Sequence, residues 1–344
     1  MKVLVLTTRV PFIHGGAEEL RDHLVRNLRR EGVQAEAMSL PFTWEPADTL
    51  LDEMAIARSL EVANADRVIA LKFPAYLVPH HNKVLWVLHQ YRQAYDLWDA
   101  GQTNIPATER GDALRAMIKT ADNQAFAECK ALFANSPVTA GRLSHYNGVK
   151  AEVLPCPLND PELFTGGPAD GYIFAGGRVG RGKRQHLLVQ ALRHAPGVRL
   201  VIAGPPDSPA EAEEVRRLAT ELGVESQVTF DLRFLSRAEL AALVNNASGV
   251  VYIPFDEDSV GYVTQEAFEA RKPVITTTDS GGVLEIVKHG QSGLVAEPTP
   301  ESIGQMFRIL MSDAGKAREM GAAGQQIDRA RNADWPATVA RLLS

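Results

Sequence analysis

Short apolar runs alternate with amphipathic runs along the whole chain. Residues 2–7, KVLVLT, lead through a polar loop into residues 17–30, where Leu20, Leu24 and Leu28 recur at one-turn spacing. A short β-branched run followed by leucines at that spacing predicts a strand, a loop and an amphipathic helix. The runs RVIAL, KVLWVL, ALFANS and AEVLP continue the series in the first half of the chain. Repetition of this unit predicts a parallel sheet covered by helices.

The alternation is interrupted once and then starts again. Residues 164–171 are rich in Gly and Pro, which indicates a linker. Further strand candidates follow it, with helical patterns at 209–222 and 237–246 between them: YIFAGG, VRLVIAG, QVTF, GVVYIP, PVITTT and GLVAEP. Two successive series predict an α/β protein with two doubly wound parallel-sheet domains. Residues 301–344 show a helical pattern, and we expect an interruption at 335–336.

Length and composition agree with this organisation. The chain has 344 residues, about twice a common domain length. Its 45% hydrophobic and 23% charged residues exclude disordered, collagenous and fibrous proteins. The 36 Lys and Arg against 42 Asp and Glu give a net charge of -6, and both halves are mildly acidic. Neither half is a basic nucleic-acid module, so no nucleic acid partner is expected.

The cysteines and the apolar segments suggest a compartment. Cys129 and Cys156 are too few for a disulfide framework and have no His or Cys neighbours at metal-ligand spacing. We therefore expect a reducing, cytoplasmic compartment. The first residues lack the apolar segment of a secretory signal, and no stretch reaches the roughly 18 apolar residues that cross a bilayer. Any membrane contact is expected to be peripheral, on the inner face of the membrane.

Unusual residues gather where the predicted strands end. In open parallel sheets, ligands bind outside the carboxyl ends of the strands, because loops and helix N-termini meet there. The following residues occupy such positions: Gly15-Gly16, His89, Gly176-Gly177-Arg178, Asp256-Glu257-Asp258 and Ser280-Gly281-Gly282. Both domains therefore present loops suited to one ligand in a cleft between them.

The segment GGRVGRGK, residues 176–183, combines glycines with the cations of Arg178, Arg181 and Lys183. Free amides and fixed cations before a helix that starts near Gln185 predict a diphosphate site. An exposed basic loop with glycines for turn geometry is the alternative. The segment also fits the GxxxxGK pattern of nucleotide triphosphatases, but Arg184 replaces the Ser or Thr whose hydroxyl should hold magnesium.

A second segment, residues 254–282, carries paired carboxylates. Asp258 precedes Gly261, and Glu266 falls about one turn into a helix predicted over 262–270. Eight positions apart, the two acids can flank a helix N-terminus and reach hydroxyls at both ends of a bound diphosphate. Either acid alone could simply stabilise the helix through its dipole. The pattern Asp-x-Asp at 256–258 could also hold Mg or Mn, but the cations of the glycine loop supply the same charge, so we expect no metal.

These segments together resemble the group 1, or family 4, retaining glycosyltransferases of the GT-B type. The resemblance is carried by GGRVGRGK, DSVGYVTQEAF and TDSGGVLEIV, and more generally by HGGAE, HQYR and FANS. It implies two Rossmann-like domains facing each other across a cleft. We expect an acceptor-side domain at 1–167, a nucleotide-sugar donor domain at 168–328, and a C-terminal helix at 329–344 that packs back on the first domain.

The resemblance also implies roles for individual residues. Arg178 and Lys183 look like the pair that binds the diphosphate leaving group. Asp258 looks like the acid that touches hydroxyls of the transferred sugar, and Glu266 like the acid on the ribose. The family usually has Glu where this chain has Asp258, so Glu257 is the alternative for that role. The remaining implied residues are His89 beside the transferred sugar, the phosphate loop Gly15 and Gly16, and the backbone amides of Gly261, Tyr262, Val263 and Thr264.

The expected function is transfer of a sugar from a nucleotide diphosphate sugar to an acceptor hydroxyl, with retention and without a metal or other cofactor. The acceptor is a glycan, a lipid-linked compound or a small molecule, as in polysaccharide biosynthesis. Other readings stay open: a P-loop-like nucleotide hydrolase or switch, a GT-B phosphorylase or epimerase, and a two-domain binding protein without chemistry.

Overall fold

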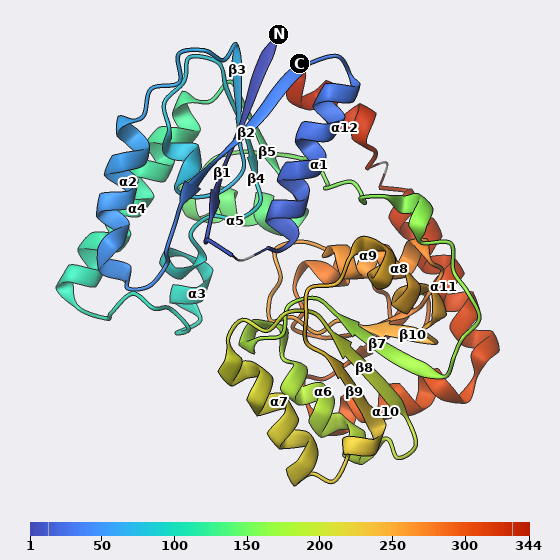
Figure 1. Ribbon diagram of the computed structural model, residues 1–344. Coiled ribbons are helices and arrows are strands. Elements are labelled where there is room, and N and C mark those ends of the chain that lie inside the picture. The colour runs from blue at the N-terminus through green and yellow to red at the C-terminus, as the bar shows by residue number, and fades with distance from the viewer. Residues whose placement is uncertain (13, 332) are drawn as a thin grey trace. The chain divides into compact units, whose positions relative to one another are not determined.

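The chain forms two compact units. The computed structural model describes residues 1–12, 14–331 and 333–344. The first unit combines Met1–Pro157 with Ala333–Ser344, and the second is the continuous segment Leu158–Asn332 between them. Figure 1 shows that each unit has a sheet with helices on its faces.

The first unit contains a six-stranded parallel sheet in the order β2-β1-β3-β4-β5-β6. Its strands are β1 (Lys2–Arg9), β2 (Gln34–Pro41), β3 (Arg67–Ala70), β4 (Lys83–Val87), β5 (Ala131–Ala134) and β6 (Glu152–Val153). Its helices are α1 (Gly16–Arg30), α2 (Leu50–Ser59), α3 (Asp96–Asp99), α4 (Glu109–Glu128), α5 (Pro137–Asn147) and α12 (Trp335–Leu343). The order changes direction between β1 and β3, as in doubly wound sheets.

Helices α1 and α12 cover the same face of this sheet and lie side by side (Figure 1). The predicted stripe of Leu20, Leu24 and Leu28 is buried there, and Trp335 of α12 joins the same apolar cluster. The expected interruption at 335–336 is wrong, because Pro336 lies in the first turn of α12 rather than between helices. Proline is tolerated in a first turn, where its missing N–H has no helical partner.

The second unit contains a six-stranded parallel sheet in the order β12-β11-β10-β7-β8-β9. Its strands are β7 (Tyr172–Gly176), β8 (Arg199–Ala203), β9 (Val228–Asp231), β10 (Gly249–Val251), β11 (Val274–Thr277) and β12 (Gly293–Ala296). Its helices are α6 (Gln185–Ala191), α7 (Pro209–Glu221), α8 (Arg237–Asn246), α9 (Tyr262–Glu269), α10 (Pro300–Ser312) and α11 (Ala314–Arg329). The chain switches sides between β7 and β10, so the loops after these two strands flank the point where doubly wound sheets bind ligands.

Alternate residues of β7 enter two different cores. Ile173 and Ala175 pack with side chains of α6, α7 and α10, whereas Phe174 packs with side chains of α8 and α9. A strand that is buried on both faces reads as a continuous apolar run, as YIFAG does. The predicted α/β class with two doubly wound sheets is therefore confirmed. None of the helices in the described part of the chain combines the length and apolarity that a bilayer span requires.

Candidate active site

The glycine loop after β7 turns sharply before α6 begins. Gly177 has φ +102°, a backbone conformation that side-chain-bearing residues rarely adopt. A short 3₁₀ turn, Arg181–Lys183, then leads to Gln185, the first residue of α6. Phe255, from the loop after β10, donates its amide to the carbonyl of Gly182 at 3.0 Å. The loops at the two sides of the switch point are therefore in contact.

Lys183 lies at this contact and is held by two side chains. Its Nζ forms an ion pair with Glu257 and donates a hydrogen bond to the hydroxyl of Tyr252 at 2.9 Å. The Tyr252 hydroxyl in turn donates to Glu257 Oε2 at 3.0 Å. Burial opposes the charged form of Lys183, but the charge and hydrogen bonds of Glu257 and Tyr252 outweigh it and raise the pKa of the ammonium. Lys183 is thus a fixed cation.

Arg178, the other cation predicted to bind a diphosphate, follows β7 and is paired differently. Its Nε lies 3.0 Å from Oδ1 of Asp207, which stands in the loop after β8. Its backbone carbonyl accepts a hydrogen bond from the side chain of Gln185 at 2.9 Å. The guanidinium is half-buried, which leaves part of its donor surface open to a ligand.

Arg184 performs a structural role at the base of the same loop. Its guanidinium forms a two-pronged ion pair with Asp279, at 2.7 and 2.8 Å, and also donates to the Thr277 hydroxyl and to two carbonyls after β10. The two carbonyls belong to Ile253 and Pro254. Burial opposes ionisation of Asp279, but the hydrogen bonds and charge of Arg184 outweigh it and lower the pKa of the carboxyl. A P-loop has the magnesium-binding hydroxyl of Ser or Thr at this position. In this chain Arg184 occupies it and links the loop after β7 to the residues after β10 and to the end of β11.

The acidic loop after β10 is packed tightly against the loop after β11. Glu257 pairs through its backbone with Gly281, and a Cβ at Gly281 would lie 2.5 Å from the Glu257 carbonyl. The amide of Gly282 donates to the same carbonyl at 2.7 Å. Asp258 is buried in this loop. The structure therefore directs Glu257 toward Lys183, and Asp258 is the next residue along the chain toward α9.

The start of α9 has the glycine that its geometry requires. Gly261 has φ +74°, and a Cβ there would lie 2.7 Å from the ring of Tyr252. Gly261 brings no side chain to cap the first amides of α9. The amide of Thr264 already donates to the Gly261 carbonyl at 3.1 Å, so the amides earlier in the turn, at Tyr262 and Val263, are the better candidates for an anion.

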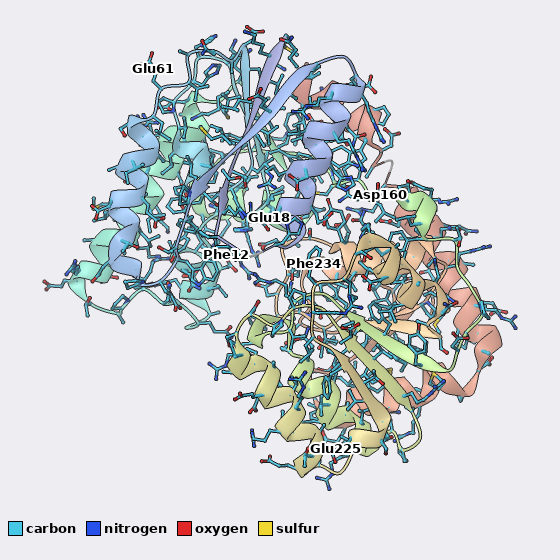
Figure 2. All side chains as sticks on the ribbon, in the orientation of Figure 1. Phe12, Glu18, Glu61, Asp160, Glu225 and Phe234 are labelled. Carbon is cyan, nitrogen blue, oxygen red and sulfur yellow. The ribbon has the colours of Figure 1, made fainter. Side chains whose placement is uncertain are left out.

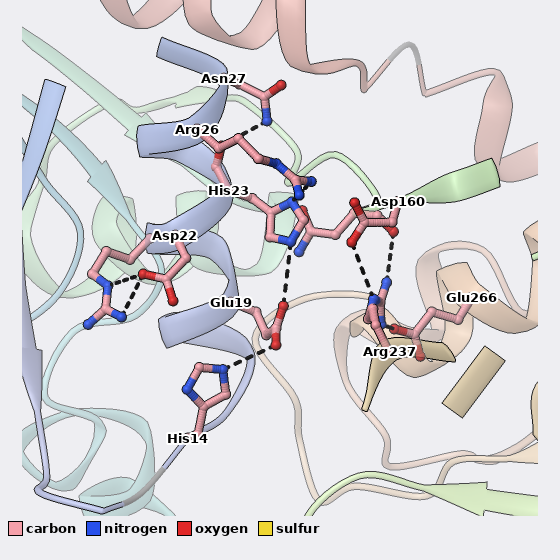
Figure 3. Close-up of polar contacts among 11 residues, drawn as sticks. His14, Glu19, Asp22, His23, Arg26, Asn27, Asp160, Arg237 and Glu266 are labelled. Atoms are coloured by element: carbon pink, nitrogen blue, oxygen red, sulfur yellow. Dashed lines mark hydrogen bonds and ion pairs between the residues drawn. The ribbon is translucent and has the colours of Figure 1, made fainter. Parts of the chain in front are cut away.

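Glu266 lies one turn into α9, as expected, and is buried with a cation. Its side chain is only 4% exposed and forms an ion pair with Arg237, the first residue of α8. Arg237 also donates to the carbonyl of Asn159 at 2.7 Å and lies 3.8 Å from Asp160. Figure 3 shows Arg237 between the two carboxylates. The ion pair with Arg237 therefore holds the buried Glu266 carboxylate in a fixed orientation.

In the first unit, Gly15 and Gly16 form the start of α1. The amide of Gly15 donates to Oε2 of Glu18 at 2.9 Å, which is a capping interaction. Glu18 is buried, is labelled in Figure 2, and lies 3.4 Å from Nζ of Lys72. In the same first turn of α1, Glu19 pairs with His14 at 3.1 Å (Figure 3). The predicted phosphate loop thus carries its own carboxylates at the helix N-terminus.

His89 follows β4 and is half-buried. Its Nδ1 lies 2.8 Å from the carbonyl of Gln90, and because a carbonyl only accepts, Nδ1 carries a proton. In the neutral ring, Nε2 is then the acceptor. The side chain of Gln90 donates to Asn147, and Asn147 donates to the hydroxyl of Tyr95 at 3.4 Å. A polar chain therefore runs from the residue beside His89 into the interior.

That chain ends on a carboxyl group, Asp122, which is fully buried in α4. The hydroxyls of Tyr76 and Tyr95 donate to its two oxygens at 2.9 and 2.7 Å. Burial raises the pKa of Asp122 to about 7, against the opposite effect of the two tyrosine hydrogen bonds. Nothing in the sequence pattern marks this aspartate, because it occupies an ordinary position of a long helix.

In the second unit, Lys183 and Gly261 both lie against Tyr252. Arg178 follows β7, Asp258 lies in the loop after β10, and Glu266 lies in α9. In the first unit it places Gly15 and Gly16 after β1 and His89 after β4, two strands that both pair with β3. Within the described ranges, no group of three His, Cys, Asp or Glu side chains is arranged to hold a metal ion.

The sequence analysis did not identify three residues of the second unit as part of the candidate site: Tyr252, Asp207 and Arg237. Asp207 could have been found, since it follows the strand next to β7 and so reaches the same sheet edge. Tyr252 could also have been found, because its hydroxyl is the polar group near the end of the apolar run GVVYIP. Arg237 gave no signal, because its partner Glu266 lies 29 positions further along the chain.

Comparison with known proteins identifies the second unit. Residues 168–327 match the family described as glycosyl transferases, group 1. Residues 168–327 are thus similar to group 1 glycosyltransferases, and the resemblance predicted from the glycine loop and the paired acids is confirmed for these residues. The matched residues include the loops after β7, β8 and β10 that form the candidate site.

The similarity of the chain to curated relatives is moderate. D-inositol 3-phosphate glycosyltransferase of Mycolicibacterium smegmatis is 32% identical over 208 residues, which is 56% of this chain and 47% of that protein. The match thus spans less than half of the relative's length.

Solved structures extend the likeness over the whole chain. Sucrose-phosphate synthase from Thermosynechococcus elongatus has a TM-score of 0.78 at 18% identity and covers 99% of this chain and 97% of its own. The HepE protein of Anabaena, solved in complex with UDP-glucose, has a TM-score of 0.74 at 19% identity and covers 100% and 98%. At these identities the likeness shows the fold, and the predicted GT-B fold is confirmed.

Proposed function

We propose that this protein transfers a sugar from a nucleotide diphosphate sugar to an acceptor hydroxyl, with retention of configuration and without a metal ion. The observation that carries the proposal is the position of Lys183 and Arg178 at the switch point of a unit that is similar to group 1 glycosyltransferases. Two fixed cations beside the uncapped start of α9 suit a diphosphate.

The reaction breaks the bond between the sugar carbon and the diphosphate oxygen and forms a bond from that carbon to the acceptor oxygen. Negative charge grows on the diphosphate, where Arg178, Lys183 and the first amides of α9 stabilise it. Each such preorganised contact typically lowers a barrier by about 3 kcal/mol. The acceptor's proton passes to the departing phosphate, which leaves from the same face, so no protein nucleophile is needed.

The carboxylates position the two sugars. Asp258 contacts hydroxyls of the transferred sugar, and Glu266 contacts those of the ribose. The ion pair with Arg237 fixes the orientation of the Glu266 carboxylate for this contact. His89, with its proton on Nδ1, presents Nε2 to a hydroxyl of the transferred sugar. A nucleotide donor is further supported by HepE, a protein of the same fold solved with UDP-glucose.

The first unit holds the acceptor, which is a glycan, a lipid-linked compound or a small molecule, with polysaccharide biosynthesis as the setting. The protein works in the cytoplasm, with peripheral contact at the inner face of the membrane for a lipid-linked acceptor. Closure of the site around the donor excludes water and limits hydrolysis.

A panel of nucleotide sugars, incubated with pure protein and no acceptor, tests the proposal. We expect slow, EDTA-resistant hydrolysis of one donor, followed by mass analysis of the released sugar. The double variant Arg178→Ala, Lys183→Ala should lose this activity, whereas Arg216→Ala, which removes an exposed cation of α7, should keep it. If the double variant hydrolyses the donor normally, the diphosphate assignment is wrong.

A further inference from the structure

Three cations around the glycine loop have carboxylate partners. Arg184 is paired with Asp279, Arg178 with Asp207, and Lys183 with Glu257. The Arg184 pair is locked by three additional hydrogen bonds and belongs to the scaffold. The other two pairs occupy cations that the proposed function assigns to the donor's phosphates, so a ligand must share or displace those carboxylates.

The Lys183 pair is the one that can exchange. The Lys183 side chain is 32% exposed and the Glu257 side chain 23% exposed, so the carboxylate can move into solvent at modest cost while Tyr252 holds Lys183. Tyr252 is buried and stays beside Lys183 through its hydroxyl, whatever Glu257 does. The triad therefore has two states, one with Glu257 on Lys183 and one with an external anion in its place.

We propose that Glu257 is a specificity-determining residue, which makes the site select nucleoside diphosphates over nucleoside monophosphates by occupying Lys183 until a stronger anion displaces it. This inference rests on the proposed function. A diphosphate brings two linked phosphate groups and engages Arg178 and Lys183 together, which offsets the loss of the internal ion pair. A monophosphate must displace the same carboxylate with only one group.

The geometry also predicts what happens after sugar transfer. Glu257 is tethered by the backbone pairing with Gly281 and therefore remains next to Lys183 at high effective concentration. When the nucleoside diphosphate begins to leave, the Glu257 carboxylate forms its ion pair with the Lys183 ammonium again. Glu257 thus shortens the residence time of the product as well as excluding monophosphates.

The experiment compares Glu257→Gln with the wild-type protein by titration calorimetry, using UDP and UMP, or the diphosphate and monophosphate of whichever nucleoside binds. Glutamine keeps the side-chain shape and removes the charge. We expect monophosphate affinity to rise roughly fivefold and diphosphate affinity less than twofold, which is the size of effect that a single solvent-accessible ion pair typically has. Glu225→Gln, an exposed site in the same unit, controls for net charge and should leave both affinities unchanged.

The outcomes separate this inference from the proposed function. If Lys183→Ala abolishes diphosphate binding but Glu257→Gln leaves the diphosphate-to-monophosphate ratio unchanged, Glu257 does not set specificity and the proposed function stands. If no nucleoside diphosphate binds the wild-type protein, or Lys183→Ala has no effect, both ideas fail. If Glu257→Gln does not fold, Glu257→Asp is the second variant. Its shorter side chain moves the carboxylate away from Lys183, and the ratio of diphosphate affinity to monophosphate affinity must then be smaller than in the wild-type protein.

Discussion

Replacing Asp122 with Asn should change how the stability of the first unit depends on pH. The carboxyl group is fully buried, and its pKa lies at about 7 in the folded protein against an ordinary value of 3.8. A carboxyl with a raised folded pKa binds more protons when folded. The contribution of Asp122 to the unfolding free energy is therefore fully present below about pH 4 and is lost as the pH rises through about 7.

The magnitude follows from the two pKa values. At 1.36 kcal/mol for a pKa difference of one, burying Asp122 costs about 4 kcal/mol at pH 8, where it is ionised, and about 2 kcal/mol at pH 5, where the fold keeps it protonated although it would ionise in the unfolded chain. Asn has no charge and offers one donor and one acceptor to Tyr76 and Tyr95, as a protonated carboxyl does. Compared with the wild-type protein, Asp122→Asn should gain about 2 to 3 kcal/mol of unfolding free energy between pH 5 and pH 8.

Urea denaturation followed by tryptophan fluorescence measures this change selectively. All four tryptophans, Trp44, Trp86, Trp98 and Trp335, belong to the first unit. Glu61→Gln removes an exposed carboxylate from the same unit and should leave the pH profile unchanged. If Asp122→Asn is no more stable relative to wild type at pH 8 than at pH 5, the carboxyl is not held near pKa 7 and the burial argument fails.

Three further changes test the second unit. Arg184→Lys should lower the unfolding free energy by about 2 kcal/mol in urea titrations, since an ammonium cannot replace a two-pronged guanidinium pair. An unchanged unfolding free energy would show that Arg184 does not hold the strand ends together. Gly261→Ala should reduce donor turnover at least tenfold, because its Cβ would lie 2.7 Å from the Tyr252 ring and φ is +74°; normal turnover would show that the start of α9 is not needed. Arg237→Gln should weaken nucleoside diphosphate binding by about tenfold in calorimetry through loss of the cation that orients Glu266; unchanged affinity would remove Glu266 from the ribose site.

The sheets and the location of the candidate site could be predicted because both follow from local patterns. Apolar runs buried on two faces, separated by amphipathic segments, indicate parallel strands and crossover helices. Since parallel strands end at one edge, the loops at Arg178 and Asp258 were expected to meet. The prediction missed β2 (Gln34–Pro41), which has no β-branched residue and a largely exposed pattern at the sheet edge.

The pairing of individual charges could not be predicted. Glu257 was considered only as a substitute for Asp258, yet its side chain lies on Lys183, and the direction is set by the backbone bridge to Gly281. Arg237 meets Glu266 because α8 and α9 pack together, and the spacing of 29 positions between them carries no periodic signal. Which cation reaches which acid depends on packing between elements, and no pattern along the chain encodes it.

The composition of the first unit has a consequence for the order in which the protein can be made. Its apolar face at Leu20, Leu24 and Leu28 is completed by Trp335 and its neighbours in Ala333–Ser344, whereas the second unit is one uninterrupted segment. During synthesis the second unit can fold before the first unit has received its last segment. If synthesis stopped before Trp335, the released chain would therefore expose the hydrophobic face of α1, and chaperones and proteases recognise exposed hydrophobic surface of this kind.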